Sequence, residues 1–338
     1  MRSKAVKVPL NKGEETRRIL RKEGILRKDL LPIKKDRFIL FPVEREIEGF
    51  EIVEDDFKPK RERINSYRDI VNIPDKLKEI LPSSYDIVGD IILIKIPDEL
   101  KPYQREIGEA LLKAHKSVKA VYHAEPVKGE LRIRDLVHLA GEKRTTTIYR
   151  EYGIEMEVDV AKVFFSPRLS GERYRIAKLV ENGEIIIDMF TGCAPFSLVI
   201  AKHANPKIIY AIDINEYAIE LARKNVKRNK MLHKIEVIHG DSSKVVRDLA
   251  KKGIRADRII MNLPFGAREF LPDALKASKD GTIIHYYSVL NENQIEEHIN
   301  HLKDITNNRI DVLKINRIKT YAPREFYICF DISVSRPA

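Results

Sequence analysis

From residue 166 onward, short apolar runs alternate with stretches of helical periodicity. The apolar runs, rich in β-branched residues, are 184–190, 207–214, 234–241, 257–264 and 281–289. The helical stretches between them are 195–204, 216–230, 243–252, 268–278 and 292–303. This alternation predicts an α/β fold with a doubly wound, mostly parallel sheet. Two extended runs within 309–335 have no helix between them, which predicts a terminal antiparallel pair.

The preceding segment has a different pattern, because extended runs predominate in it and one helical stretch, 101–115, interrupts them. These extended runs are 85–97, 119–125, 129–136, 144–151 and 154–165. Strand-rich sequence with a single helix predicts an α+β domain.

The N-terminal segment predicts a small α/β module. Residues 12–29 form an amphipathic helical pattern broken at Gly24, and 38–44 form a strand pattern. An acidic run at 54–56 followed by a basic run at 58–63 predicts a linker. We therefore divide the chain into a module at 1–56, a linker at 57–68, an α+β domain at 69–165 and an α/β domain at 166–338.

Positive charge is concentrated in residues 1–40. The chain carries a net charge of +11, and residues 1–40 hold 13 Lys or Arg and 5 Asp or Glu, so 13 − 5 = +8 lies there. Such a segment indicates a polyanionic partner, with nucleic acid first, and the alternative is a solubilising surface.

The remaining composition narrows the class of protein. The hydrophobic fraction of 43% indicates a globular chain, and 33% charged residues with two cysteines resemble a thermophile's composition. The nine histidines and two cysteines show no metal-ligand or disulfide spacing, so we expect no metal. No apolar run reaches membrane-spanning length, and the N-terminus lacks a signal sequence. We expect a soluble, cytoplasmic protein.

Polar residues stand where the predicted parallel strands end, which is where α/β sheets bind ligands. Asp188 and Gly192 follow the first strand, and the glycine lets the backbone approach a ligand closely. Asp213 lies about 20 residues beyond Gly192, the spacing of an acid that binds ribose hydroxyls. Asp241 ends the third strand, where a carboxylate can accept from an adenine amino group. The local alternative for Asp213 and Asp241 is a helix N-cap.

The fourth strand ends in Asn262-Leu263-Pro264-Phe265. Parallel strands followed by an antiparallel pair resemble the class I S-adenosylmethionine-dependent methyltransferase fold. Amino-methyltransferases of that fold carry an Asn-Pro-Pro-Tyr type motif at this strand end, with the asparagine contacting the amine that is methylated. The resemblance implies S-adenosyl-L-methionine as the cofactor. Ala194 departs from the family pattern, which has a second glycine there.

Further motifs identify the family. They are GELRIRDL (129–136), FFSPRLSGERYRI (164–176) and KTYAPREF (319–326), together with DMFTG, AIDIN and MNLP in this order. Over essentially its whole length the chain resembles the archaeal and eukaryotic tRNA (guanine(37)-N1)-methyltransferase family, which is related to enzymes of the wyosine pathway. The resemblance implies methyl transfer to N1 of guanine 37 in the anticodon loop. It also implies that the N-terminal module contacts the outer corner of the tRNA.

The resemblance assigns roles to catalytic residues. Glu172 matches the general base that removes the N1 proton, and Arg132 matches the residue that contacts guanine O6. Asn262 orients the base, and Pro264 holds the turn by fixing its backbone. The local alternatives are a surface salt bridge of Glu172 with Arg168 or Arg175, and an edge-strand charge for Arg132.

The resemblance also assigns cofactor contacts, and Phe164 replaces a family tyrosine. The implied contacts are Arg173, Asp188, Gly192, Asp213, Ile214, Asp241, Ser242 and Asn262.

Other functions remain open from the sequence. A wyosine-pathway enzyme would transfer the aminocarboxypropyl chain of the same cofactor, or would also methylate C7 of a wyosine precursor. A non-enzymatic RNA-binding protein with a degenerate cofactor fold is supported by Ala194 alone. We expect a monomer.

Overall fold

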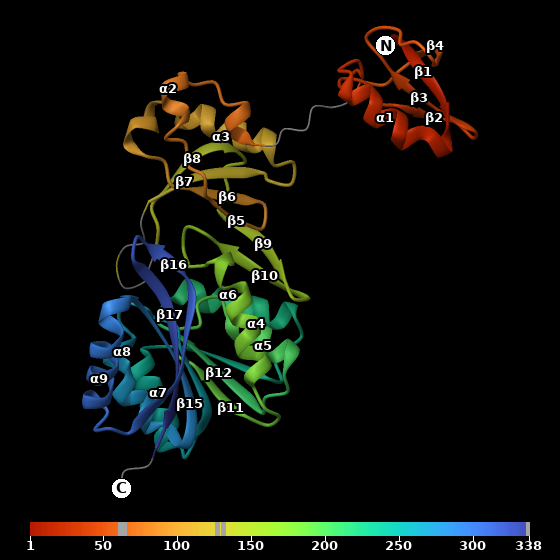
Figure 1. Ribbon diagram of the computed structural model, residues 1–338. Coiled ribbons are helices and arrows are strands. Elements are labelled where there is room, and N and C mark those ends of the chain that lie inside the picture. The colour runs from red at the N-terminus through yellow and green to blue at the C-terminus, as the bar shows by residue number, and fades with distance from the viewer. Residues whose placement is uncertain (60–65, 126–128, 130–132, 336–338) are drawn as a thin grey trace. The chain divides into compact units, whose positions relative to one another are not determined.

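The computed structural model describes residues 1–59, 66–125, 129 and 133–335 (Figure 1). Arg132, the predicted guanine O6 contact, lies outside these residues. The chain separates into two compact units, Met1–Asp69 and Ile70–Ala338. Short 3-10 helices lie at Leu10–Lys12, Tyr67–Asp69, Asp98–Tyr103, Pro167–Leu169 and Glu292–Gln294.

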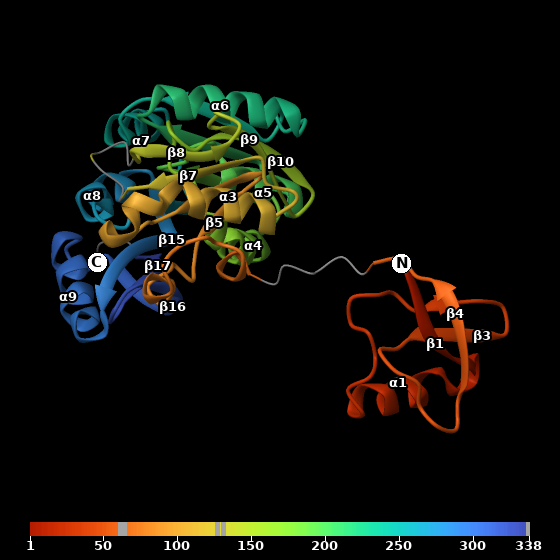
Figure 2. The same cartoon turned by 90° about the horizontal axis from the view of Figure 1, so that it is seen from above.

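The small unit is a four-stranded sheet with one helix along a face (Figure 2). The strands, in the order β2-β3-β1-β4, are β1 (Arg2–Pro9), β2 (Ile33–Lys34), β3 (Phe38–Pro42) and β4 (Glu51–Asp56). Helix α1 spans Gly13–Lys22 and buries Leu20 against Val6 and Phe41. Gly24, at a φ of +67°, follows it, so the helix ends where the sequence predicts a break.

The acidic residues 54–56, which the sequence pattern groups with the linker signal, form part of β4 and so lie within the module at 1–56. They form an edge strand that pairs with β1. Glu54 forms an ion pair with Arg2, and Asp55 forms one with Lys35. A run of like charge here belongs to an edge strand whose charges are balanced by neighbouring cations.

The first part of the large unit contains the predicted single long helix, α3, and strands within the predicted runs 119–125, 144–151 and 154–165. Its elements are α2 (Asp75–Lys78), β5 (Asp86–Val88), β6 (Ile91–Ile94), α3 (Gln104–Ala114), β7 (Ala120–Ala124), β8 (Leu136–Gly141), β9 (Thr146–Glu151) and β10 (Ile154–Asp159). The strand predicted at 129–136 is not found there: residues 130–132 lie outside the described residues, and the strand of this region is β8, which begins at Leu136. Strands β5-β6-β7-β8 form one sheet, and β9 and β10 form a separate antiparallel pair. The run 85–97 is a hairpin instead of one strand, because Gly89 turns the chain at a φ of +58°.

The remainder of the large unit is a seven-stranded sheet in the order β13-β12-β11-β14-β15-β17-β16. Its strands are β11 (Ile185–Asp188), β12 (Ile208–Asp213), β13 (Ile235–His239), β14 (Ala256–Met261), β15 (Ser278–Asn291), β16 (Ile310–Ala322) and β17 (Glu325–Val334). The first five are parallel, and the last two add as the predicted antiparallel pair.

Helices cover both faces of this sheet. They are α4 (Ser170–Leu179), α5 (Pro195–His203), α6 (Glu216–Arg228), α7 (Ser242–Lys251), α8 (Ala267–Lys276) and α9 (Ile295–Ile305). Adjacent residues of β11 face opposite cores: Ile186 packs with residues of α4, α5 and α6, and Ile187 packs with residues of α7, α8 and α9. This arrangement confirms the predicted doubly wound fold.

Helix α4 is absent from the sequence prediction. Its buried residues include Glu172 and Arg173, so the face that packs inward is partly charged. Hydrophobic periodicity cannot reveal such a helix.

Among the residues that the structure describes, no helix is both long and apolar enough to cross a membrane.

Candidate active site

The carboxyl ends of the parallel strands bring the predicted polar residues to one edge of the sheet. Strands β11 and β14 are neighbours, and the order of strands along the chain reverses between them. Asp188 ends β11, and Asn262 follows β14 directly. Asp213 ends β12, the neighbour of β11 on its other side. The predicted residues therefore surround the point where α/β sheets bind ligands.

Asp213 shapes the glycine loop that connects β11 to α5. Its Oδ2 accepts a hydrogen bond of 2.7 Å from the Gly192 N–H, and its Oδ1 accepts one of 2.9 Å from the Asn215 N–H. Asn215, not Asp213, caps α6, because the Asn215 side chain accepts from two N–H groups of the first helical turn. Burial raises the pKa of Asp213. The N-cap alternative for Asp213 is therefore wrong.

The loop keeps a glycine-like backbone where the family pattern has its second glycine. Gly192 has a φ of +55°, and Ala194 has a φ of +68°. A left-handed conformation costs a non-glycine residue about 1–2 kcal/mol. The chain thus retains the loop shape in spite of Ala194, which argues against a degenerate cofactor site.

The residues after β12 and β13 complete this edge. Asp241 caps α7 by accepting from the Lys244 N–H at 3.2 Å, so the N-cap alternative is confirmed for Asp241. Ser242 is buried, and its hydroxyl donates to the Met189 carbonyl oxygen in the glycine loop. Ile214 is 51% exposed and offers an apolar surface beside Asp213. Ser242 therefore supports the loop from inside.

Asp188 is a fully buried carboxyl with an unsatisfied oxygen. Its Oδ2 accepts hydrogen bonds of 2.8 Å from the hydroxyls of Thr191 and Ser197. Its Oδ1 has no hydrogen-bond partner among the described residues. Burial raises the pKa of Asp188 to about 6. A buried acceptor without a donor is costly, and it indicates a site completed by a ligand that carries donors or positive charge.

Replacing Asp188 with Asn should stabilise the ligand-free protein above pH 6. A carboxyl whose pKa rises from 3.8 to about 6 contributes stability that is present below pH 3.8 and is lost as the pH rises through 6. That loss is at most ~3 kcal/mol, and the Asn variant avoids it. Urea unfolding of both proteins at about pH 4 and about pH 8 measures the difference. A stability difference that does not change with pH would contradict the assignment.

Glu172, the predicted general base, is buried on α4 with both carboxylate oxygens engaged. Arg175 donates to it from Nε at 2.7 Å and from Nη2 at 2.8 Å, and the Tyr287 hydroxyl donates to Oε1 at 2.7 Å. The salt-bridge alternative is therefore confirmed for Arg175, but the pair is internal. Arg168 pairs with Asp86 instead, at 2.6 Å.

Two tyrosines connect Glu172 with Asn262. The Tyr327 hydroxyl donates to Asn262 Oδ1, and the Tyr287 hydroxyl donates to Glu172. The two rings lie 5.8 Å apart between centroids. Glu172 precedes the parallel strands in the sequence, and Tyr327 follows them. The fold thus brings residues that are far apart along the chain into one cluster.

The turn after Asn262 exposes an aromatic face. Pro264 is buried, whereas Phe265 is 64% exposed and packs edge-on against Tyr321 with ring centroids 5.5 Å apart. Tyr321 lies near the end of β16 and is 51% exposed.

Arg173, a predicted cofactor contact, points into the protein. It is 1% exposed, its guanidinium donates to both oxygens of Glu151 at 2.6 and 2.7 Å, and it also donates to the Ser166 carbonyl oxygen. In the structure, this side chain therefore forms an internal ion pair between α4 and β9.

Sequence reasoning did not find Arg175, Tyr287 or Tyr327 as parts of the site. From the sequence alone, His285 and the pair Tyr286-Tyr287 are expected to be structural residues of a strand. The sequence does contain a signal for Tyr287, namely the alternation of side chains along a strand. In β15 this alternation places Tyr287 on the sheet face that packs against α4 and α5, and Tyr286 on the opposite face.

The fold and this site define a class I methyltransferase. The sequence matches three family models: the TRM5/TYW2 methyltransferase domain at 147–313, the TYW2 N-terminal domain at 67–145 and the tRNA methyltransferase 5 N-terminal domain at 5–51. The chain belongs to the TRM5/TYW2 methyltransferase family.

Individual relatives agree with this assignment. The chain is 44% identical to the tRNA (guanine(37)-N(1))-methyltransferase Trm5b of Pyrococcus abyssi, over 98% of this chain and 99% of the relative. It is 35% identical to the tRNA(Phe) (4-demethylwyosine(37)-C(7)) aminocarboxypropyltransferase of Pyrococcus horikoshii, over 78% and 93%. It is similar to the solved complex structure of aTrm5 and tRNALeu with a TM-score of 0.83 and 37% identity, over 98% of this chain and 99% of that chain.

Proposed function

We propose that this protein transfers the methyl group of S-adenosylmethionine to N1 of guanine 37 in tRNA. The observation that carries the proposal is the cluster in which a buried carboxylate, Glu172, is joined through Tyr287 and Tyr327 to Asn262 at the switch point of the sheet. The full-length similarity to a tRNA (guanine(37)-N(1))-methyltransferase supports it.

The residues at the carboxyl edge fit this cofactor. The glycine loop around Gly192 gives the backbone close access, the Asp213 carboxylate accepts from ribose hydroxyls, and Ile214 and Asp241 contact the adenine. The unsatisfied Asp188 Oδ1 supports a ligand with donors or positive charge at the same edge. When bound, S-adenosylmethionine supplies a methyl group activated by a positively charged sulfur.

Glu172 and Asn262 act on the guanine. N1 carries a proton and is a poor nucleophile, so Glu172 accepts that proton as N1 is methylated. Asn262 orients the base edge, and Pro264 fixes the turn that carries it. Arg132 stabilises the negative charge that spreads to O6.

The tRNA is bound by all parts of the chain. Guanine 37 flips out of the anticodon loop, and the exposed rings of Phe265 and Tyr321 offer a stacking surface beside Asn262. The domain at 69–165 holds the anticodon side, and the module at 1–56, whose residues 1–40 are basic, contacts the outer corner. Because phosphate contacts dominate such binding, affinity should fall steeply with salt. We also propose that the enzyme acts as a monomer.

Mass spectrometry of nucleosides tests this function. Unmodified tRNA with guanine 37 is incubated with the enzyme and S-adenosylmethionine, and we expect 1-methylguanosine with S-adenosylhomocysteine as the second product. An aminocarboxypropyl adduct with methylthioadenosine would instead assign the chain to the wyosine reaction. Product formed only from a wyosine precursor would also contradict the proposal.

A further inference from the structure

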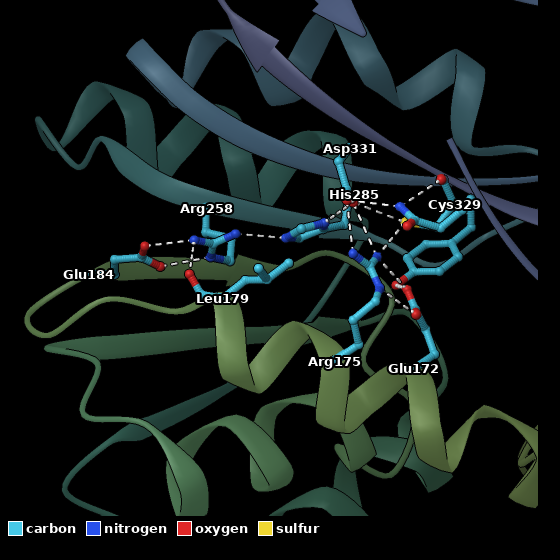
Figure 3. A network of polar contacts seen from close by, with 10 residues as sticks. Glu172, Arg175, Leu179, Glu184, Arg258, His285, Cys329 and Asp331 are labelled. Carbon is cyan, nitrogen blue, oxygen red and sulfur yellow. Dashed lines mark hydrogen bonds and ion pairs between the residues drawn. The ribbon is translucent and has the colours of Figure 1, made fainter. Parts of the chain in front are cut away.

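A continuous polar network lies between α4 and the sheet, and Glu172 is one end of it (Figure 3). Its members come from α4 and the sheet strands β14, β15 and β17, with Glu184 at the far end. The successive contacts are Glu172 to Arg175 at 2.7 Å, Arg175 to Asp331 at 2.8 Å, Asp331 to His285 at 2.7 Å, His285 to Arg258 at 2.8 Å and Arg258 to Glu184 at 2.8 Å.

The contacts determine the charge of His285. Arg258 has no acceptor, so it donates to His285 Nε2, which must therefore carry a lone pair. Nδ1 then carries the proton and donates to Asp331 Oδ1. Burial lowers the pKa of His285, in agreement with a neutral ring.

Asp331 is consequently held as an anion. Although burial opposes its ionisation, hydrogen bonds from His285 and Arg175 lower the pKa of Asp331. The Asn316 side chain adds a further donor at 2.9 Å. Asp331 therefore stays charged when its surroundings change.

Arg175 is shared between two carboxylates. Its Nε and Nη2 donate to Glu172, and its Nη1 and Nη2 donate to Asp331 at 2.8 and 3.2 Å. If Glu172 becomes neutral, the guanidinium keeps a full counter-charge in Asp331. Without Asp331, protonation of Glu172 would leave a half-buried cation without a partner, which is unfavourable.

We propose that Asp331 is a positioning residue that acts through Arg175, balancing the guanidinium while Glu172 holds the proton of guanine N1. The inference rests on the proposed function. As the N1–H bond breaks, its electron pair forms the bond from N1 to the methyl carbon, and the proton moves to a Glu172 oxygen. The electron pair of the carbon–sulfur bond stays on sulfur. The Glu172 proton then leaves to water, and Arg175 returns to both carboxylates.

The other groups around Glu172 do not take this role. Tyr287 and Cys329 face it from β15 and β17, and burial raises the pKa of each well above its usual range, so both stay neutral near neutral pH. Lys319 of β16 lies over the Tyr327 ring, at 5.4 Å from its centroid. Arg173, on the same helix, is bound to Glu151.

A metal ion is the alternative occupant of this network. His285, Cys329 and Asp331 each offer one potential ligand atom, and these three atoms lie within 4.8 Å of one another. Arg175 Nη2, however, donates to Cys329 Sγ at 3.3 Å and to Asp331. A guanidinium already supplies the positive charge that a metal would bring, so the cluster serves Arg175.

Single-turnover methyl transfer measured against pH tests the proposal, with Asp331→Asn as the principal variant. We expect a loss of about 100-fold in the plateau rate, at the lower end of the range of a general-base effect. Because Arg175 then pairs with Glu172 alone, the acid limb of the pH profile should move to lower pH. Arg175→Gln should move that limb to higher pH, because Glu172 loses its cation. Affinity for tRNA should stay unchanged in both variants.

Asp273→Asn is the matched control, because Asp273 is also buried and paired with an arginine, Arg247, at 2.9 Å, but lies on α8. We expect its rate and pH profile to equal those of the wild type. The proposal would be overturned if the acid limbs of Asp331→Asn and Arg175→Gln do not move. It would also be overturned if both limbs move in the same direction. Should Asp331→Asn not fold, an unmoved limb in Arg175→Gln alone overturns it. A wild type without 1-methylguanosine would overturn the proposed function with it.

Discussion

Replacing Glu172 with Gln should lower the single-turnover rate of methyl transfer by between about 10²-fold and 10⁴-fold, the range of a lost general base. The amide cannot accept the guanine N1 proton at neutral pH. It keeps the shape of the carboxylate and can still accept from the Tyr287 hydroxyl, so the fold and tRNA affinity should survive. Rapid-quench assays with saturating enzyme measure the rate, and filter binding measures the affinity.

The control for this substitution is Glu157→Gln on β10. Glu157 is partly buried, and its carboxylate forms ion pairs with Lys224 and Arg228 of α6, so the side chain belongs to the contact between β10 and α6 and not to the cluster of Glu172, Tyr287, Tyr327 and Asn262. We expect the control to methylate tRNA at the wild-type rate. A Glu172→Gln variant with the rate of the control would remove Glu172 from the chemistry.

Local sequence patterns predicted most of the elements whose buried faces are apolar, although β1, which buries Ala5, Val6 and Val8, was not predicted. The parallel strands are apolar runs, and the strand-end residues Asp188, Asp213 and Asn262 follow them at the carboxyl edge of the sheet. Helix α4 and the acidic strand β4 were missed because their sequences are charged. Charged residues on a buried helix face or on a paired edge strand give the same sequence pattern as an exposed segment.

The network around Glu172 could not be predicted from spacing. Tyr287 is 115 residues from Glu172 along the chain, and Asp331 is 156 residues from Arg175. These contacts depend on the antiparallel strand β17 lying beside β15, which is a property of the assembled sheet. The sequence identified Glu172 through a motif, but the groups that control its charge come from elements whose local patterns indicate only strands.

Removing Arg173 should destabilise the protein strongly, because it leaves Glu151 as a buried charge without a partner. Arg173 is 1% exposed, and the side chain of Glu151 is 4% exposed. Breaking one half of such a pair costs about 3–5 kcal/mol, whereas replacing both halves with apolar residues is often neutral. We expect Arg173→Met to lower the free energy of unfolding by that amount and Arg173→Met with Glu151→Leu to restore most of it. Urea denaturation measures both, and Arg150→Met, which breaks the exposed pair with Glu155, should cost less than about 1 kcal/mol.

The same double variant separates two roles of Arg173. The sequence resemblance places this residue at the cofactor, whereas the structure places its guanidinium on Glu151 and the Ser166 carbonyl oxygen. If the ion pair is its whole role, the restored double variant should bind S-adenosylmethionine with wild-type affinity in calorimetry. Restored stability without cofactor binding would show that Arg173 reaches the cofactor as well. In that case the buried pair with Glu151 would hold the guanidinium for the ligand, because a fixed arginine loses less entropy on binding than a mobile one.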